Sequence, residues 1–181
     1  VNNDFISKVE FSKNRGGIHK AFTEDGTEIN TKTIIISTGA SAKYLGIPSE
    51  QRLRGGGVSA CAVCDGFFFK GQEVAIVGGG DTAAEEATYL AKICSKVTML
   101  VRKNQMRASK AMQHRVLKTA NIDLRYNSEI EEVLGDQLVE GVRIKNNQTN
   151  VKEEISVSGL FIAIGHKPNT DLFRGQIEMD E

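Results

Sequence analysis

Residues 73–83 of this 181-residue chain read Glu-Val-Ala-Ile-Val-Gly-Gly-Gly-Asp-Thr-Ala, a strand-like apolar run followed by a glycine turn. Good helix formers follow directly, so the turn joins a strand to a helix. In that context the pattern G-x-G-x-x-G/A is typical of a dinucleotide-binding loop. Gly78 would permit the tight turn, Gly80 would let the backbone approach a pyrophosphate, and Ala83 would allow close helix packing.

The loop therefore predicts cofactor contacts from Gly78, Gly79, Gly80, Asp81 and Thr82, with the pyrophosphate on free backbone N–H groups at the helix start. A plain glycine turn before a helix is the alternative. Asp81 opposes the first interpretation, because a carboxylate repels a pyrophosphate. Its side chain would have to cap the helix or lie to one side of the ligand.

The segments around this loop predict the rest of the fold. Strand patterns occupy 73–77, 96–101 and 122–126, and helical patterns occupy 81–93 and 109–119. This β-α-β-α-β order is the signature of a parallel sheet with crossover helices. Residues 128–157 have the pattern of an antiparallel meander, and 160–164 form a last buried strand. We predict the α/β class, with a Rossmann-like parallel sheet plus an antiparallel β-meander.

The first part of the chain has a different pattern. Residues 5–11 and 18–22 are expected to be strands on either side of a glycine turn. The β-branched run 33–37 predicts a buried strand, and the glycine of the Thr38-Gly39-Ala40 sequence that ends it suits the close approach of a ligand. Residues 47–57 contain a proline and three consecutive glycines, which is the composition of a linker.

Three cations follow the second strand of the β-α-β unit. An NAD site places an acidic residue about 20 residues after the glycine loop, where it holds the ribose 2′-hydroxyl. Here the strand ends in Val101-Arg102-Lys103, and Arg107 comes shortly after. Guanidinium groups match the geometry of a phosphate, so Arg102, Lys103 and Arg107 predict recognition of the 2′-phosphate of NADP(H). A solvated basic loop is the alternative.

Cys61 and Cys64 form a Cys-x-x-Cys pair, and Cys94 is the third cysteine of the chain. Such a pair is either a redox dithiol or half of a zinc site. A zinc site needs a second pair of ligands, and the three histidines are scattered along the sequence. We therefore favour the redox dithiol over a zinc site and over a pair without a role, and we predict no metal site. Cys94 lies in a helical run and is expected to be a small buried hydrophobe.

The composition excludes several classes of function. Lys plus Arg and Asp plus Glu both total 23, so the formal net charge is zero, which argues against nucleic-acid or anionic-membrane partners. No apolar run approaches the ~18 residues of a membrane span, and no signal peptide is evident, so a cytoplasmic location is expected. The chain lacks an initiator methionine and begins like the middle of a fold, which predicts a fragment.

Together these motifs resemble the low-molecular-weight thioredoxin reductases, which are flavoproteins of the pyridine nucleotide-disulfide oxidoreductase class. The matching stretches occur in family order with family-like spacing, at 36–40, 61–66, 78–83, 107–108 and 163–170. Cys-Ala-x-Cys-Asp-Gly at 61–66 beside a nucleotide loop is highly specific. The resemblance covers nearly the whole chain.

The resemblance implies a reaction in which electrons pass from NADPH to FAD, then to the Cys61–Cys64 pair, and finally to the disulfide of thioredoxin. Cys64 would be the thiol nearer the flavin, Cys61 would attack thioredoxin, and Asp65 would be the acid/base. The family pattern adds Ile164, Gly165 and His166 as NADPH contacts, and Thr38, Gly39 and Ala40 as FAD contacts in the parent. The family is usually homodimeric.

By the same resemblance, residues 1–46 would end the first half of an FAD domain and 47–57 would be a linker. Residues 58–172 would form the NADPH-binding domain with its dithiol, and 173–181 would begin the return to the FAD domain. The usual His-Arg-Arg is Val101-Arg102-Lys103 here, which keeps positive charge but loses the stacking histidine and one bidentate guanidinium. The chain alone is expected to bind no flavin and to be inactive.

Two other interpretations stay open. A related flavoprotein disulfide reductase would pass electrons to a different protein acceptor. A non-catalytic nucleotide-binding module would not use the dithiol at all.

Overall fold

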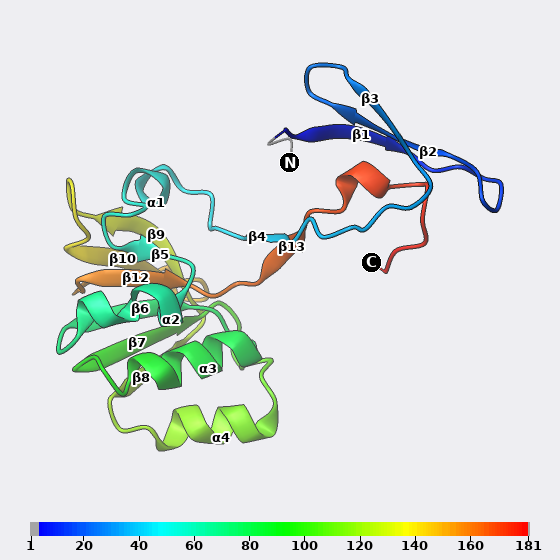
Figure 1. Cartoon of the computed structure of the whole chain (residues 1–181). Coiled ribbons are helices and arrows are strands. Elements are labelled where there is room, and N and C mark those ends of the chain that lie inside the picture. Colours follow the sequence, from blue (N-terminus) through cyan, green and yellow to red (C-terminus); the bar gives the residue numbers. More distant parts are fainter. Residues whose placement is uncertain (1–3, 181) are drawn as a thin grey trace. The chain divides into compact units, whose positions relative to one another are not determined.

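Strand β6 (Glu73–Val77) lies at the centre of a five-stranded parallel sheet in the computed structural model, which describes residues 4–180 (Figure 1). The sheet order is β5-β12-β6-β7-β8, and each neighbouring pair runs parallel. The other strands are β5 (Val58–Ser59), β7 (Lys96–Val101), β8 (Ile122–Tyr126) and β12 (Gly159–Ile162). The predicted parallel sheet is therefore confirmed, and the strands predicted at 73–77, 96–101 and 122–126 have the bounds of β6, β7 and β8.

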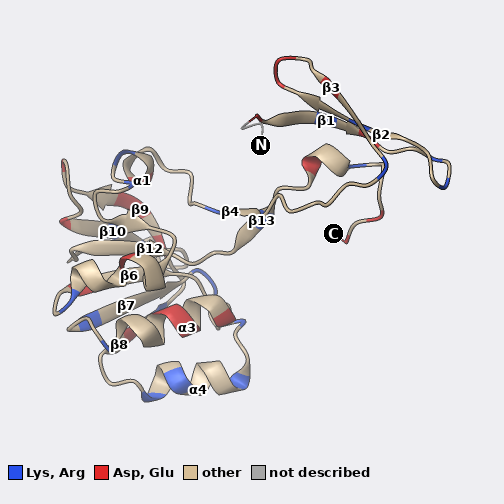
Figure 2. Ribbon diagram, in the orientation of Figure 1, with Lys and Arg blue, Asp and Glu red and all other residues tan. Residues whose placement is uncertain are grey.

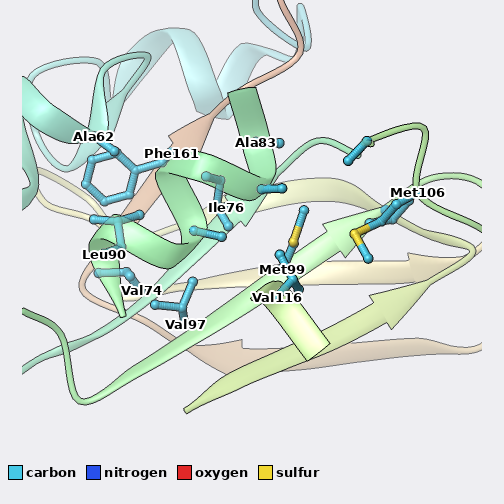
Figure 3. Packing of buried hydrophobic residues seen from close by; sticks show 14 of the residues in the cluster. Ala62, Val74, Ile76, Ala83, Leu90, Val97, Met99, Met106, Val116 and Phe161 are labelled. Carbon is cyan, nitrogen blue, oxygen red and sulfur yellow. The ribbon is translucent and has the colours of Figure 1, made fainter. Parts of the chain in front are cut away.

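Strands β6, β7 and β12 are buried on both faces of the parallel sheet, as their nearly continuous apolar runs require, while the edge strand β8 is only partly buried. Alternate residues of β6 point to opposite faces, so Val74 and Ile76 join one cluster while Ala75 and Val77 join the other. Helices α3 (Asp81–Leu90) and α4 (Lys110–Lys118) cover the first face, where Leu90 and Val116 pack on the sheet (Figure 3). Each fully buried aliphatic side chain contributes roughly 1.5–3 kcal/mol.

The second face is covered by an antiparallel sheet in the order β11-β10-β9. Its strands are β9 (Ser128–Leu134), β10 (Gly141–Asn146) and β11 (Lys152–Ser156). Val133 and Val142 are opposite each other in the register of β9 and β10, and both belong to the cluster on this face. The predicted meander is confirmed.

The segment 47–57, which has the composition of a linker, is folded and partly buried. Helix α1 (Pro48–Arg52) occupies it, with proline at the first turn, where the missing N–H costs nothing. Glu50 is fully buried, and its carboxylate accepts hydrogen bonds from the backbone N–H groups of Leu45 and Gly46, at 2.8 and 2.9 Å. Leu53 is also buried and packs in the cluster that includes the meander. These buried contacts turn a glycine-rich and proline-containing segment into part of the core.

The described chain divides into two compact units, residues 42–166 and a smaller unit of residues 4–41 and 167–180. The smaller unit contains an antiparallel sheet in the order β1-β2-β3 and a short helix, η2 (Asp171–Phe173). Its strands are β1 (Ile6–Glu10), β2 (His19–Thr23) and β3 (Glu28–Thr31). Gln176 ties the two parts of this unit together, because its side chain accepts from the Phe11 N–H and donates to the Val9 carbonyl. The limits of the functional domains stay a prediction.

The buried strand predicted at 33–37 is absent from the structure. These residues form no strand, and the side chain of Ile35 is 92% exposed. A β-branched run becomes a buried strand only where other strands pair with it, and none of the described strands does so. The next strands are β4 (Ala40–Ala42) and β13 (His166–Pro168), which pair in a two-stranded sheet. Within residues 4–180, no helix is both long enough and apolar enough to cross a membrane.

Candidate nucleotide cleft and dithiol site

A cleft of about 560 Å³ lies within the unit 42–166, at the carboxyl ends of β6 and β7. This is the end of a parallel sheet at which α/β proteins bind ligands. Most of the residues predicted to contact the nucleotide border it: Gly78, Gly79, Gly80, Thr82, Arg102, Lys103, Arg107, Ile164 and Gly165. Asp81 and His166 are not on its wall. Glu129 of β9 is, and no sequence pattern had indicated it.

The three glycines of the loop have different reasons to lack a side chain. Gly78 has φ +149°, and a Cβ there would lie 2.3 Å from the carbonyl oxygen of Ala163. A Cβ on Gly79 would lie 2.9 Å from Cγ1 of Val101. A Cβ on Gly80 would have no described atom within 4 Å, so the fold of residues 4–180 does not itself require glycine there. Open space at Gly80 on the wall of the cleft fits a backbone that a pyrophosphate approaches closely.

Asp81 interacts with the protein itself. Its carboxylate accepts a hydrogen bond of 2.9 Å from the backbone N–H of Ser109. This bond, together with the Ser109 side chain, holds the pKa of Asp81 below its usual range. Gly80, and not Asp81, is the N-cap residue of α3, so the carboxylate does not cap this helix. Asp81 is also absent from the wall of the cleft, which agrees with the other placement that the sequence left open, to one side of the ligand.

The three predicted cations are exposed around the cleft, and none of them forms an ion pair with a described carboxylate. Their backbone is held in place. The side-chain amide of Asn147 donates to the carbonyl of Arg102 over 2.7 Å, and the N–H of Arg107 donates to the carbonyl of Gly79 over 2.6 Å. Side chains that have no carboxylate partner and stand on a fixed backbone are available to a phosphate.

Cys61 and Cys64 form a disulfide in the same unit, with their Cα atoms 5.3 Å apart. Cys61 is the N-cap of the short helix α2 (Ala62–Asp65), and its Sγ accepts a hydrogen bond of 3.2 Å from the backbone N–H of Cys64. A backbone N–H aimed at Sγ also stabilises the thiolate after reduction. Among residues 4–180, no group of three or more His, Cys, Asp or Glu side chains is placed to hold a metal ion.

Cys94 is buried, as predicted, and does not take part in this chemistry. Burial raises the pKa of its thiol, so the reactive thiolate is disfavoured.

Two features near the disulfide were missed by sequence reasoning. The Ser59 hydroxyl lies between Asp65 and the backbone of Cys61, and no motif marks it. Phe67 and Phe68 belong to η1 (Gly66–Phe69), which follows α2 directly, and their side chains are 70% and 74% exposed. The Phe-Phe-Phe sequence that follows the cysteine motif is visible in the chain, but an apolar run of this kind does not distinguish exposed side chains from buried ones.

Glu86 of α3 is a partly buried carboxylate behind α2. One of its oxygens is buried without a hydrogen-bond partner among the described residues. Burial raises the pKa of Glu86, while the backbone amide of Ala62 and the charge of His166 oppose that rise. His166 therefore lies within the electrostatic range of Glu86, although it does not border the cleft.

Thr38, Gly39 and Ala40, the predicted flavin contacts, belong to the smaller unit. The carbonyl of Thr38 accepts from the side chain of Asn169, and the carbonyl of Gly39 accepts from its backbone N–H, each over 3.0 Å. Asn169 thus fixes this stretch through two backbone contacts.

Comparison with known proteins agrees with this arrangement. The family described as pyridine nucleotide-disulphide oxidoreductase matches residues 3–181. The thioredoxin reductase of Rickettsia conorii is 49% identical over 181 residues, which covers 98% of this chain and 57% of the relative. The thioredoxin reductase of Vibrio cholerae is 50% identical over 180 residues, with coverages of 97% and 55%.

A solved structure of thioredoxin reductase from Lactococcus lactis superposes with a TM-score of 0.85 at 38% identity, over 98% of this chain and 58% of that one. The chain thus spans little more than half the length of the relatives it matches. Within that span the family match runs through both compact units, the glycine loop and the cysteine pair. On this ground the chain belongs to the pyridine nucleotide-disulphide oxidoreductase family.

Proposed function

We propose that this chain is the NADPH-binding and dithiol portion of a thioredoxin-disulfide reductase. The observation that carries the proposal is a Cys61–Cys64 disulfide in the same compact unit as a glycine-lined cleft, bordered by three cations that have no carboxylate partner within residues 4–180. The relatives named above are thioredoxin reductases, which supports the same reaction for the longer protein.

The cleft would hold NADP(H), which supplies a hydride when bound. Gly80 would admit the pyrophosphate, and the N–H groups at the start of α3 would bind it. Arg102, Lys103 and Arg107 would bind the 2′-phosphate, and Ile164 and Gly165 would contact the cofactor from the neighbouring strand end. Glu129 also borders the cleft, and its negative charge would offset part of the attraction between the three cations and the phosphate.

The dithiol would reduce the disulfide of thioredoxin. The Cys61 thiolate attacks one sulfur of the acceptor, and the Cys64 thiolate then displaces the acceptor from Cys61 and restores the disulfide. Asp65 supplies a proton to the sulfur that leaves and takes one from the Cys64 thiol. The exposed side chains of Phe67 and Phe68 beside the pair favour a protein acceptor, because an apolar rim binds a protein surface better than a small polar disulfide.

Flavin would bind in the longer protein, with Thr38, Gly39 and Ala40 among its contacts. The described residues offer only this one exposed stretch for it, so we expect the purified chain to be colourless and inactive. We further propose a cytoplasmic, homodimeric parent enzyme.

The test is the oxidation of NADPH by the full-length protein with thioredoxin as the acceptor. We expect turnover that Cys61→Ser abolishes and that Cys94→Ser leaves unchanged, since Cys94 is buried away from the pair. Turnover with another redox protein but not with thioredoxin would favour a different acceptor. NADPH binding without turnover on any disulfide would favour a non-catalytic module.

A further inference from the structure

Ser59 connects the first redox cysteine to the carboxyl group of Asp65. It lies in β5, the edge strand of the parallel sheet, and only 8% of its surface is exposed. Its hydroxyl donates to Oδ2 of Asp65 over 2.6 Å and accepts from the backbone N–H of Cys61 over 3.0 Å. One buried side chain therefore holds both groups at once.

The hydroxyl can serve Asp65 in either charge state. A serine hydroxyl has one proton to donate and can accept two hydrogen bonds. An ionised carboxylate only accepts, so the proton of Ser59 then points to Asp65. When Asp65 is protonated, it can donate to Ser59, whose own proton has a second acceptor in the carbonyl oxygen of Cys61, 3.4 Å away. Neither state leaves a buried polar group without a partner.

We propose that Ser59 is a positioning residue for the dithiol reaction, holding the Asp65 carboxyl beside Cys61 in both protonation states. The inference rests on the proposed acid/base role of Asp65 and deepens it. A residue that gains and loses a proton in each cycle needs a partner that accepts both states, and the contacts of Ser59 meet that need.

Ser59 would support the exchange between the dithiol and the disulfide of its acceptor. The Cys61 thiolate attacks one sulfur of the acceptor disulfide, which breaks that S–S bond and forms a mixed disulfide. The departing acceptor sulfur takes the electron pair and the proton of Asp65. Asp65 then takes the proton of the Cys64 thiol, and the resulting thiolate attacks Cys61 and releases the second acceptor sulfur as a thiolate. Two electrons pass from the dithiol to the acceptor.

The experiment follows one round of exchange between the chemically reduced chain and oxidised thioredoxin, by stopped flow. We expect Ser59→Ala and Ser59→Val to slow exchange by about tenfold or more, because positioned proton transfer is worth roughly 10²–10⁴ in rate. Ser59→Thr should keep most of the rate, because threonine keeps the hydroxyl. Ser59→Val is the matched comparison, since valine differs from threonine mainly in lacking that hydroxyl. The reduction potential of the dithiol should stay the same in all three variants, because the proposed role of Ser59 affects the rate of exchange and not the free-energy difference between the oxidised and reduced forms.

Ser49→Ala is the matched control. The hydroxyl of Ser49 also accepts from a backbone N–H, that of Val133, over 3.0 Å, but it lies in α1 and touches neither cysteine nor Asp65. Its loss should leave exchange unchanged, and a slowing equal to that of Ser59→Ala would overturn the proposal. Thermal unfolding of each variant shows whether the fold is intact, and the threonine–valine pair provides the comparison if alanine fails to fold.

A double-mutant cycle separates this proposal from the one it rests on. In an Asp65→Asn background, Ser59→Ala should slow exchange no further. If it slows exchange there as much as in the wild type, Ser59 does not act through Asp65 and the proposal is wrong. If Asp65→Asn alone leaves the exchange rate unchanged, the acid/base role of Asp65 is wrong, and so is the positioning role of Ser59 that rests on it. If Asp65→Asn slows exchange but Ser59→Ala does not, only the role of Ser59 falls.

Discussion

The hydrogen bond of 2.9 Å from the Ser109 backbone N–H to the Asp81 carboxylate ties the first turn of α3 to the N-cap of α4. Ser109 in turn caps α4, because its Oγ accepts from the backbone N–H of Met112. The aspartate of the glycine loop thus has a structural partner, which explains how a carboxylate can be next to a predicted pyrophosphate site.

The first prediction concerns this bond. The folded protein lowers the pKa of Asp81, so the contact stabilises the fold above the usual carboxyl pKa and is lost as the pH falls through the folded pKa. Asp81→Ala should therefore be less stable than the wild type at neutral pH, with the difference closing in acid. Urea unfolding across that range measures it. Asp81→Asn keeps an acceptor oxygen, so its stability should lie between those of the wild type and Asp81→Ala. A stability difference between the wild type and Asp81→Ala that does not change with pH would contradict the bond between Ser109 and the ionised carboxylate.

The second prediction separates the glycines of the loop. Gly78→Ala should destabilise the fold by about 2 kcal/mol or more, because the new Cβ would collide with the Ala163 carbonyl at a positive φ. Gly80→Ala should fold normally, because nothing lies within 4 Å of its Cβ, yet it should weaken NADPH binding by about tenfold or more. Thermal unfolding and calorimetric titration decide the two effects. Normal NADPH binding by Gly80→Ala would refute the placement of the pyrophosphate.

The third prediction is the choice of nucleotide. Two charge-assisted contacts to the 2′-phosphate should favour NADPH over NADH by on the order of a hundredfold, and added salt should narrow the gap. Arg102→Ala should weaken NADPH binding by about tenfold and leave NADH binding nearly unchanged. Arg115→Ala removes an exposed charge from α4, which carries several cations but does not border the cleft, and is the control (Figure 2). Equal affinities for the two nucleotides would show that the cations form only a solvated loop.

The fourth prediction concerns the cysteines. The oxidised chain, once unfolded, should titrate as one thiol, that of Cys94, and dithiothreitol should raise the count to all three. In the folded, reduced chain Cys94 should react slowly, because it is buried and its pKa is raised. Cys61→Ser should remove the dependence on oxidation. Stoichiometric zinc in the purified chain would support the metal-site alternative instead.

The fifth prediction uses Glu86. Burial raises its pKa in the folded state, so the fold is favoured while Glu86 is protonated, and this contribution is lost as the pH rises through the folded pKa. Glu86→Gln should therefore gain stability over the wild type as the pH rises from about 4 to about 8. The gain should stay below about 1 kcal/mol, because the carboxyl is only half-buried and solvent screens it. Glu85→Gln, an exposed change on the same helix, is the control, and urea unfolding at both pH values is the measurement.

Local patterns predicted β6, β7 and β8 with their bounds, because short runs rich in apolar and β-branched residues between turn residues are typical of strands, and their alternation with helical patterns is typical of a parallel sheet. The glycine loop and the three cations of the cleft followed from the same local patterns, whereas Ile164 and Gly165 followed only from the family resemblance. Glycines at a strand end and cations after the next strand occupy neighbouring positions at one edge of a parallel sheet, whatever the rest of the chain does.

Contacts that join distant parts of the fold could not be predicted in this way. Residues 33–37 have the composition of a buried strand but lack a partner among the described strands, while 47–57 have the composition of a linker but supply the buried Glu50 and Leu53. Ser59 and Glu86 lie outside every motif. Their contacts with the residues in and next to α2 arise because β5 and α3 pack beside that helix. Burial and hydrogen bonding depend on which groups meet in space, and only the packed chain determines that.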